Sequence, residues 1–137
     1  MSIIYHLKES SMHITRVGTT QRWSDAVIFN GAVYMVEVPT KLNASLAEQT
    51  QELLELVAAG LVKYGSNHAH IISATIYLRD IKQIDEFNQV WDNWLPNGSA
   101  PVRACVEAKL AHADYKVEIQ LVAAVTNHAR PNVEFMT

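Results

Sequence analysis

The sequence predicts an α+β protein in which a mixed β-sheet is covered on one face by two helices. Three observations support this prediction. Runs of alternating or β-branched residues lie near both ends of the chain and in its middle. Two helical patterns, over residues 45–64 and 81–95, separate these runs. The order is therefore strand, strand, helix, strand, helix, strand, strand, which favours one helical layer on a sheet of mixed direction.

The first two strands are predicted to form a hairpin around Asn30-Gly31, the strongest short signal for a two-residue turn. They should cover residues 26–29 and 32–38, and Pro39 should end the second because proline cannot donate to a ladder. Glu37 stands in this otherwise apolar strand. We interpret it either as a solvent-facing edge residue or as a polar group lining a pocket.

The first helix is predicted from Ser45, which has a glutamate three residues later in the spacing of a capping box, to about Tyr64. Gly65 suits the position after its last turn. A β-branched strand is expected over residues 70–78. Asp80 can then cap the second helix.

The last two strands are predicted over residues 100–108 and 115–125, and the short loop 110–114 should join them as an antiparallel hairpin. One face of this hairpin is expected to carry Arg103 and Glu118 together.

Arg103 is the leading candidate for a functional group. An arginine is always charged, so among apolar neighbours its planar fork needs an anionic partner. That partner is either Glu118, in a structural ion pair, or the carboxylate of a ligand. Cys105 on the same strand is a weak candidate for a nucleophile, because a strand thiol is usually an inert small hydrophobe.

The composition predicts one domain over residues 1–137, with a core at about 22–125 and a C-terminal tail at 126–137. The net charge of −3 disfavours binding to nucleic acid or an anionic membrane. A single cysteine suits a reducing compartment, and neither a signal peptide nor an apolar run of bilayer length is found, so a cytoplasmic protein is expected.

Neither a resident metal nor a common cofactor is predicted. His68 and His70 have a spacing that zinc accepts, but a third ligand at a recognisable spacing is missing. The sequence also contains neither a glycine-rich phosphate loop nor a nucleophile elbow. Of the remaining polar and aromatic residues, Trp23 is placed near a pocket mouth, and Asn88 is interpreted as a solvent-facing helix residue.

Several strands carry apolar residues on both sides, notably over residues 33–36 and 123–124. One helical layer covers only one face of the sheet, so the other face should be covered by self-association.

The pattern Pro101-x-Arg103-x-Cys105-Val106-Glu107, followed by Val117-Glu118-Ile119, resembles the C-terminal signature of the RidA (YjgF-type) enamine/imine deaminases. The resemblance spans about Arg22 to Val125. It implies a chorismate-mutase-like fold whose sheets form the central barrel of a homotrimer, with pockets at the subunit interfaces. It also implies hydrolysis of 2-imino acids to 2-keto acids and ammonia without a metal or cofactor.

The resemblance also implies roles for individual residues. Arg103 is similar to the arginine that holds the substrate carboxylate, and Glu118 to the glutamate that orients a water. Cys105 falls where backbone groups face the substrate. Asn88 falls where the second helix often has asparagine, and Trp23 where many members have a pocket tyrosine.

The chain also departs from the family pattern. Residues 35–37 read Met-Val-Glu where the family has Ser-Gly-Gln, which makes the pocket bulkier and, through Glu37, more acidic. The opening Trp23-Ser24-Asp25 resembles a YoaB-like side branch. These departures leave two alternatives to catalysis: a trimer that only binds small keto or amino acids, and ribonuclease or translation inhibition, which the acidic net charge disfavours.

Overall fold

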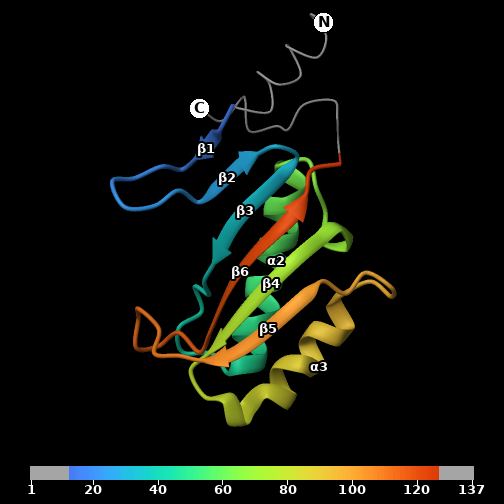
Figure 1. Ribbon diagram of the computed structural model, residues 1–137. Helices are drawn as coiled ribbons and strands as arrows, with labels where there is room; N and C mark the ends of the chain where they lie inside the picture. The colour runs from blue at the N-terminus through green and yellow to red at the C-terminus, as the bar shows by residue number, and fades with distance from the viewer. Residues whose placement is uncertain (1–12, 127–137) are drawn as a thin grey trace, which may run out of the picture.

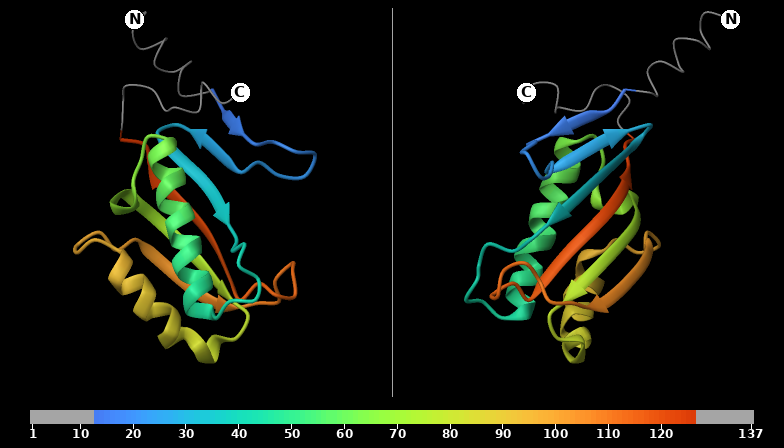
Figure 2. Two further views of the ribbon diagram at one scale, coloured as in Figure 1. Left: turned by 180° about the vertical axis from the view of Figure 1, so that it is seen from behind. Right: turned by 60° about the vertical axis from the view of Figure 1, so that its left-hand side comes forward.

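The computed structural model describes residues 13–126 and contains one sheet with the strand order β1-β2-β3-β6-β4-β5. Within this range two α-helices, α2 (Leu46–Lys63) and α3 (Ile84–Trp94), lie on one face of the sheet, and the other face is not covered by any described residues (Figures 1 and 2). The predicted α+β class with one helical layer is therefore confirmed. Residues 127–137, most of the predicted tail, lie outside the described part of the chain.

The first three strands form an antiparallel meander. They are β1 (Thr15–Val17), β2 (Ala26–Phe29) and β3 (Ala32–Glu37). Asn30 and Gly31 join β2 to β3 with φ angles of 52° and 79°. Two successive residues in the left-handed region are what the two-residue turn requires, so the hairpin predicted at this dipeptide is confirmed.

The start of α2 is built by its capping box. The Ser45 side chain accepts a hydrogen bond from the Glu48 backbone N–H, and the Glu48 carboxylate accepts one from the Ser45 N–H. These bonds satisfy donors that have no partner inside the helix, a contribution of about 1 kcal/mol. At the other end Gly65 has a φ of 85°, as expected for the residue that ends a helix in the left-handed region.

The second half of the chain supplies the remaining strands. A 3₁₀ turn (His68–His70) leads into β4 (Ile71–Leu78), and another (Ile81–Gln83) leads into α3. Asp80 caps this second turn by accepting a hydrogen bond from the Lys82 backbone N–H. Then follow β5 (Val102–Glu107) and β6 (Val117–Ala124).

The hairpin predicted between the last two strands is wrong. In the structure β5 pairs in parallel with β4 at the edge of the sheet, whereas β6 lies between β3 and β4 and is antiparallel to both. The helix α3 provides the long crossover that two parallel strands need. The sequence of β6 fits this central position, because its alternate residues Val117, Ile119, Leu121 and Ala123 are all buried.

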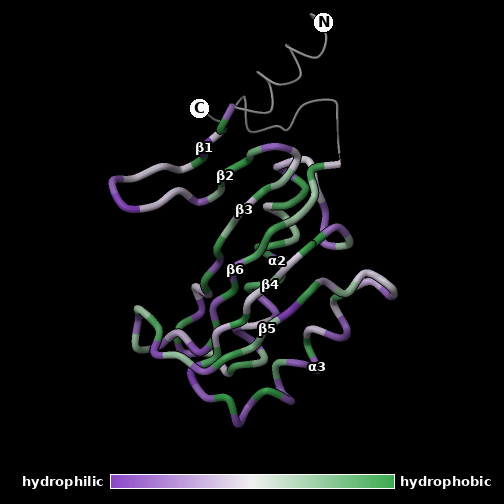
Figure 3. Tube along the Cα trace, viewed as in Figure 1, coloured by the Kyte–Doolittle hydropathy of each residue, from purple (hydrophilic) through white to green (hydrophobic). Residues whose placement is uncertain are grey.

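The core lies between the sheet and the helices. Alternate residues of β3, β4 and β6 point toward α2 and α3, and the buried residues of the helices meet them. Figure 3 shows hydrophobic residues recurring along these strands, while the connection from β1 to β2 is mostly hydrophilic. On the uncovered face large apolar side chains remain exposed, among them Tyr34, Val36, Val102 and Val106.

Candidate functional site

Arg103 lies on the edge strand β5 and faces α3. It is paired in register with Ala74, which is buried beneath the helices, so both side chains share the helical face of the sheet. The guanidinium carbon lies 5.8 Å from the ring centroid of Phe87 and 5.4 Å from that of Trp91. Contacts with aromatic rings hold an arginine by cation–π attraction and leave the donors at its rim free for another partner.

A cavity of about 290 Å³ opens beside this guanidinium. Its lining comes from α3 and from the residues that lead into β5: Asn88, Trp91, Asp92, Ala100, Pro101 and Arg103. Asn88 is partly buried, and its Oδ1 atom is inaccessible and has no hydrogen-bond partner. A buried acceptor without a partner is costly, so this atom favours a ligand that donates a hydrogen bond.

The sequence did not single out Trp91 or Asp92 for this cavity. The available signal is helical spacing, because Asn88, Trp91 and Asp92 stand at i, i+3 and i+4 and therefore share one side of α3.

Cys105 lies two residues beyond Arg103 on the same face and packs against the core. Burial raises the pKa of its thiol, against the opposing effect of the Arg103 charge. A thiol held in its neutral form is a poor nucleophile, which agrees with its interpretation as a packing residue.

Glu118 lies on the other face of the sheet. It is paired in register with Tyr77, whose neighbours on β4, Ile76 and Leu78, both point into the core. Arg103 and Glu118 therefore lie on opposite faces of the sheet, which excludes the ion pair within one chain that was one of the two alternatives for Arg103. The shared face expected for the two side chains followed from the wrong hairpin.

A larger cavity, of about 550 Å³, lies at Glu118. Its lining comes from the β1–β2 connection, the end of β3 and the loop before β6: Trp23, Ser24, Asp25, Val36, Glu37, Val38, Ala111, Tyr115 and Glu118. Burial raises the pKa of the Glu118 carboxyl group. A carboxylate with increased proton affinity is better suited to accept a proton than a fully solvated one.

Trp23 is held at the rim of this larger cavity by a tight turn. Its backbone N–H donates to the Thr20 hydroxyl at 3.2 Å, and its carbonyl accepts from the Thr20 N–H at 2.7 Å. The indole remains 60% exposed, which agrees with its predicted place at a pocket mouth.

Glu37 borders the larger cavity, but its position in register with the buried Ile119 turns its side chain toward α2. Val36, in register with Gln120, points to the same side as Glu118. The Glu37 pKa is raised, first by burial and then by the negative charges of Asp25 and Glu52, while a hydrogen bond from the Val38 N–H acts against the rise. Glu37 thus lies between the Glu118 cavity and a third cavity beneath α2.

The matched protein family is described as endoribonuclease L-PSP, and its model covers residues 13–125. A curated relative, the RutC family protein YoaB of Escherichia coli K12, is 46% identical over 114 residues, which are 83% of this chain and 100% of that protein. A RutC family protein of Haemophilus ducreyi is 39% identical, over 84% of this chain and 98% of its own length.

Among solved structures, a YjgF family protein from Neisseria meningitidis superposes with a TM-score of 0.79 at 41% identity, over 83% of this chain and 96% of that one. The chain belongs to the YjgF (RidA, RutC) family. The resemblance inferred from the Arg103 and Glu118 motifs, including the YoaB-like branch, is therefore confirmed.

In this YjgF-family chain His68 and His70, whose spacing zinc would accept, line neither the Arg103 cavity nor the Glu118 cavity. The His68 ring packs against Trp94 at a centroid distance of 5.0 Å with the two planes tilted by 38°, and the His70 Nδ1 atom lies 3.0 Å from the Thr126 hydroxyl. Among residues 13–126 no group of three metal-ligating side chains is present. In the same range no helix is long and apolar enough to cross a membrane.

Proposed function

We propose that the protein hydrolyses 2-imino acids, and the enamines in equilibrium with them, to 2-keto acids and ammonia. One observation carries the proposal: an arginine whose contacts are two aromatic rings, beside a buried amide oxygen that lacks a partner. A 2-imino acid offers the matching groups, because its carboxylate can take both arms of the Arg103 fork and its N–H can donate to Asn88.

The proposed site is completed by association into a homotrimer. In one protomer the Arg103 cavity and the Glu118 cavity open on opposite faces of the sheet. Apolar side chains remain exposed on the uncovered face, including Val102 at 76% exposure on the edge strand itself. Burying this face against a neighbour would bring the β5 edge of one protomer to the Glu118 cavity of the next, which supports a site shared between subunits.

The proposed reaction adds one water to the imine carbon. Glu118 accepts a proton from the water as its oxygen forms a bond to C2, and the C=N electron pair moves to nitrogen, which takes up a proton. In the resulting aminoalcohol the hydroxyl proton is transferred to nitrogen, the C–N bond breaks, the keto group forms and ammonia leaves. An imine carbon is already electrophilic, so positioning and one proton acceptor supply most of what the reaction needs.

The test is ammonia release from 2-imino acids that an amino-acid oxidase generates in the assay. Arg103→Ala should lower kcat/KM by roughly 100-fold or more, because a bidentate charged contact to the carboxylate is lost. Arg16→Ala is the matched control, since Arg16 is an exposed residue on β1, and it should retain full activity. Full activity of a correctly assembled Arg103→Ala variant would refute the proposed role.

The alternative is a trimer that binds small carboxylates without turning them over. Val36 favours it, because this side chain lines the Glu118 cavity where the family pattern has a glycine. Saturable binding of a 2-keto acid, lost in Arg103→Ala and unaccompanied by ammonia release in the wild type, would support it. RNA cleavage that survives purification and is abolished by Arg103→Ala would instead support the nuclease activity in the family's name.

A further inference from the structure

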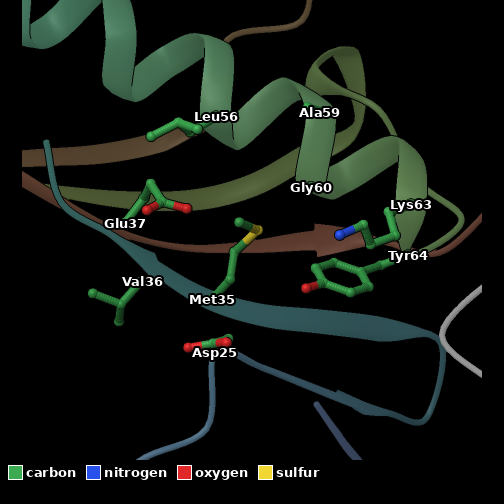
Figure 4. A pocket seen from close by; sticks show the side chains of 9 residues that line it. All are labelled: Asp25, Met35, Val36, Glu37, Leu56, Ala59, Gly60, Lys63 and Tyr64. Atoms are coloured by element: carbon green, nitrogen blue, oxygen red, sulfur yellow. The ribbon is translucent and has the colours of Figure 1, made fainter. Parts of the chain in front are cut away.

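A third cavity lies between the end of β3 and the last turns of α2, on the helical side of the sheet (Figure 4). Its volume is about 380 Å³, within the range of small-molecule sites. Neither Arg103 nor Glu118 lines it. The residues that matter for its chemistry are Asp25, Met35, Glu37, Gly60, Lys63 and Tyr64.

Two carboxylates, from different strands, border this cavity. Asp25 precedes β2 and Glu37 ends β3, and both line the cavity. In Figure 4 the Glu37 side chain lies on the α2 side of β3, with Met35, whereas Asp25 lies beyond the other side of this strand. The two charges act on each other across the site, since Asp25 contributes to the raised pKa of Glu37. Glu37 is partly buried and Asp25 is exposed, and two like charges that act on each other favour a cation between them.

Tyr64 provides an independent indication of a ligand. Its side chain is only 7% exposed, and its hydroxyl points into the cavity from the end opposite Glu37 (Figure 4). Within residues 13–126 this hydroxyl makes no hydrogen bond. Burial of the residue, followed by the charges of Asp25 and Glu37, raises the pKa of the phenol, so the hydroxyl is neutral and lies in a negative field.

The space itself is made by a missing side chain. Gly60 lies in the last turns of α2, where glycine costs about 1 kcal/mol relative to alanine. A Cβ atom at this position would lie 3.2 Å from the methyl carbon of Met35. The floor of the cavity is therefore apolar and its walls are acidic, which suits a short alkyl chain that carries a positive charge.

We propose that this cavity binds a small organic molecule through a primary ammonium group held by Asp25 and Glu37. The Tyr64 hydroxyl and ring contact the ligand at the far end, and its alkyl chain packs on Met35 and Gly60. A metal ion fits less well, because the described residues offer no third carboxylate, histidine or cysteine there. Lys63 lies at the Tyr64 end and can accept a carboxylate if the ligand carries one.

The Met35 methyl group is a direct reporter of occupancy. The sequence has four methionines, and Met35 is the one among the described residues, so its signal is assigned by comparison with a Met35→Leu variant. The full-length protein with ¹³C-labelled methionine methyls is titrated with butylammonium, 4-aminobutyrate, butyrate and 1-butanol at constant ionic strength. A saturable shift of the Met35 signal is expected with the two ammonium compounds and not with butyrate or 1-butanol.

Variants then test each contact. Asp25→Asn combined with Glu37→Gln should weaken butylammonium binding about 10-fold or more, since two partly exposed charge contacts are lost. Tyr64→Phe should weaken it a few-fold, and Ala59→Phe should abolish it by filling the cavity while leaving the charges in place. Arg103→Ala should leave the shift unchanged, which separates this site from the proposed catalytic one.

The two ammonium probes distinguish the source of the ligand. Tighter binding of 4-aminobutyrate than of butylammonium, lost in Lys63→Met, assigns the site to an amino acid, and equal binding assigns it to a simple amine. The proposal is overturned if neither compound shifts the Met35 signal saturably, or if the shift survives the double variant. It is also overturned if binding appears only in Lys63→Met, because the Lys63 ammonium would then be the resident cation.

Discussion

The Arg103 cavity and the Glu118 cavity are held in place in different ways. Arg103 rests on Phe87 and Trp91, two buried aromatic residues of α3, so apolar packing positions the cation. The Glu118 cavity is walled partly by loops, and a buried amide fixes one of them, the loop before β6. The position of Arg103 therefore depends on the core, whereas the Glu118 cavity depends on a few hydrogen bonds.

The amide belongs to Gln49 of α2, whose side chain is fully buried. Its Nε2 atom donates to the carbonyls of Asp114 at 3.0 Å and Lys41 at 3.2 Å, and its Oε1 atom accepts from the Lys116 N–H at 2.8 Å. Gln49 thereby ties the loop after β3 to the loop before β6. Tyr115, which lines the Glu118 cavity, lies between the two bonded positions on the second loop.

The largest effect is expected from Glu118→Gln. Glutamine keeps the size of the side chain but cannot accept a proton, so kcat/KM should fall by about 100-fold or more. The wild-type rate should also fall as the pH drops through the raised pKa of Glu118, because the ionised form is the acceptor. The rate of the variant should not show this fall at low pH, and pH–rate profiles of both proteins on one substrate provide the measurement. The same fall in the variant would assign the titration to another group.

Gln49→Leu should disrupt the Glu118 cavity, whose loop depends on hydrogen bonds, and leave the Arg103 cavity, which depends on the core, intact. Leucine is similar in size but leaves the Lys116 N–H and the Asp114 carbonyl without partners, at a cost of about 2–4 kcal/mol in the free energy of unfolding. KM should rise, because the wall at Tyr115 is no longer fixed.

Gln51→Leu is the matched control for this experiment. Gln51 is exposed on the same helix, and its Nε2 atom donates only to the Glu55 carboxylate at 3.0 Å. Denaturant unfolding and steady-state kinetics of both variants provide the measurements. Equal effects of the two substitutions would contradict the special role of Gln49.

Local structure could be predicted from the sequence, whereas the pairing of strands that sets the two cavities apart could not. Local signals were sufficient for the Ser45 capping box and the Asn30-Gly31 turn, because each is decided within a few residues. The uncovered apolar face was predictable too, since alternation assigns side chains to opposite faces. Alternation does not say which strand is the neighbour, however, and the same pattern in residues 102–107 fits β4 as well as β6.

That ambiguity explains the errors at the site. Once β5 is paired with β4, Arg103 faces α3, and its surroundings depend on how that helix crosses the strand. Asn88 and Trp91 enter the cavity through this crossing, which is a long-range packing property. Glu118 lines a cavity, but its position relative to Arg103 could not be inferred without the strand order.

The smallest effect is expected at Glu37, on the boundary between the Glu118 cavity and the cavity beneath α2. Because its pKa is raised, the folded state binds the proton more tightly than the unfolded state, and the associated stability is lost as the pH rises through the folded pKa. Ionised Glu37 therefore lowers stability at neutral pH. Glu37→Gln should raise Tm at pH 7 by a few degrees at most, since solvent reaches the group, and the gain should shrink toward pH 4.

Glu48→Gln should change Tm in the opposite direction in the same experiment. The Glu48 pKa is lowered, chiefly by the hydrogen bond from the Ser45 backbone N–H, so its contribution is present above the unfolded pKa and lost as the pH falls. Glu48→Gln should therefore lower Tm at pH 7, and this loss should also shrink toward pH 4. Thermal unfolding of both variants at the two pH values provides the test. A Glu37→Gln variant that is less stable than the wild type at pH 7 would mean that a cation already compensates the Glu37 charge in the isolated protein.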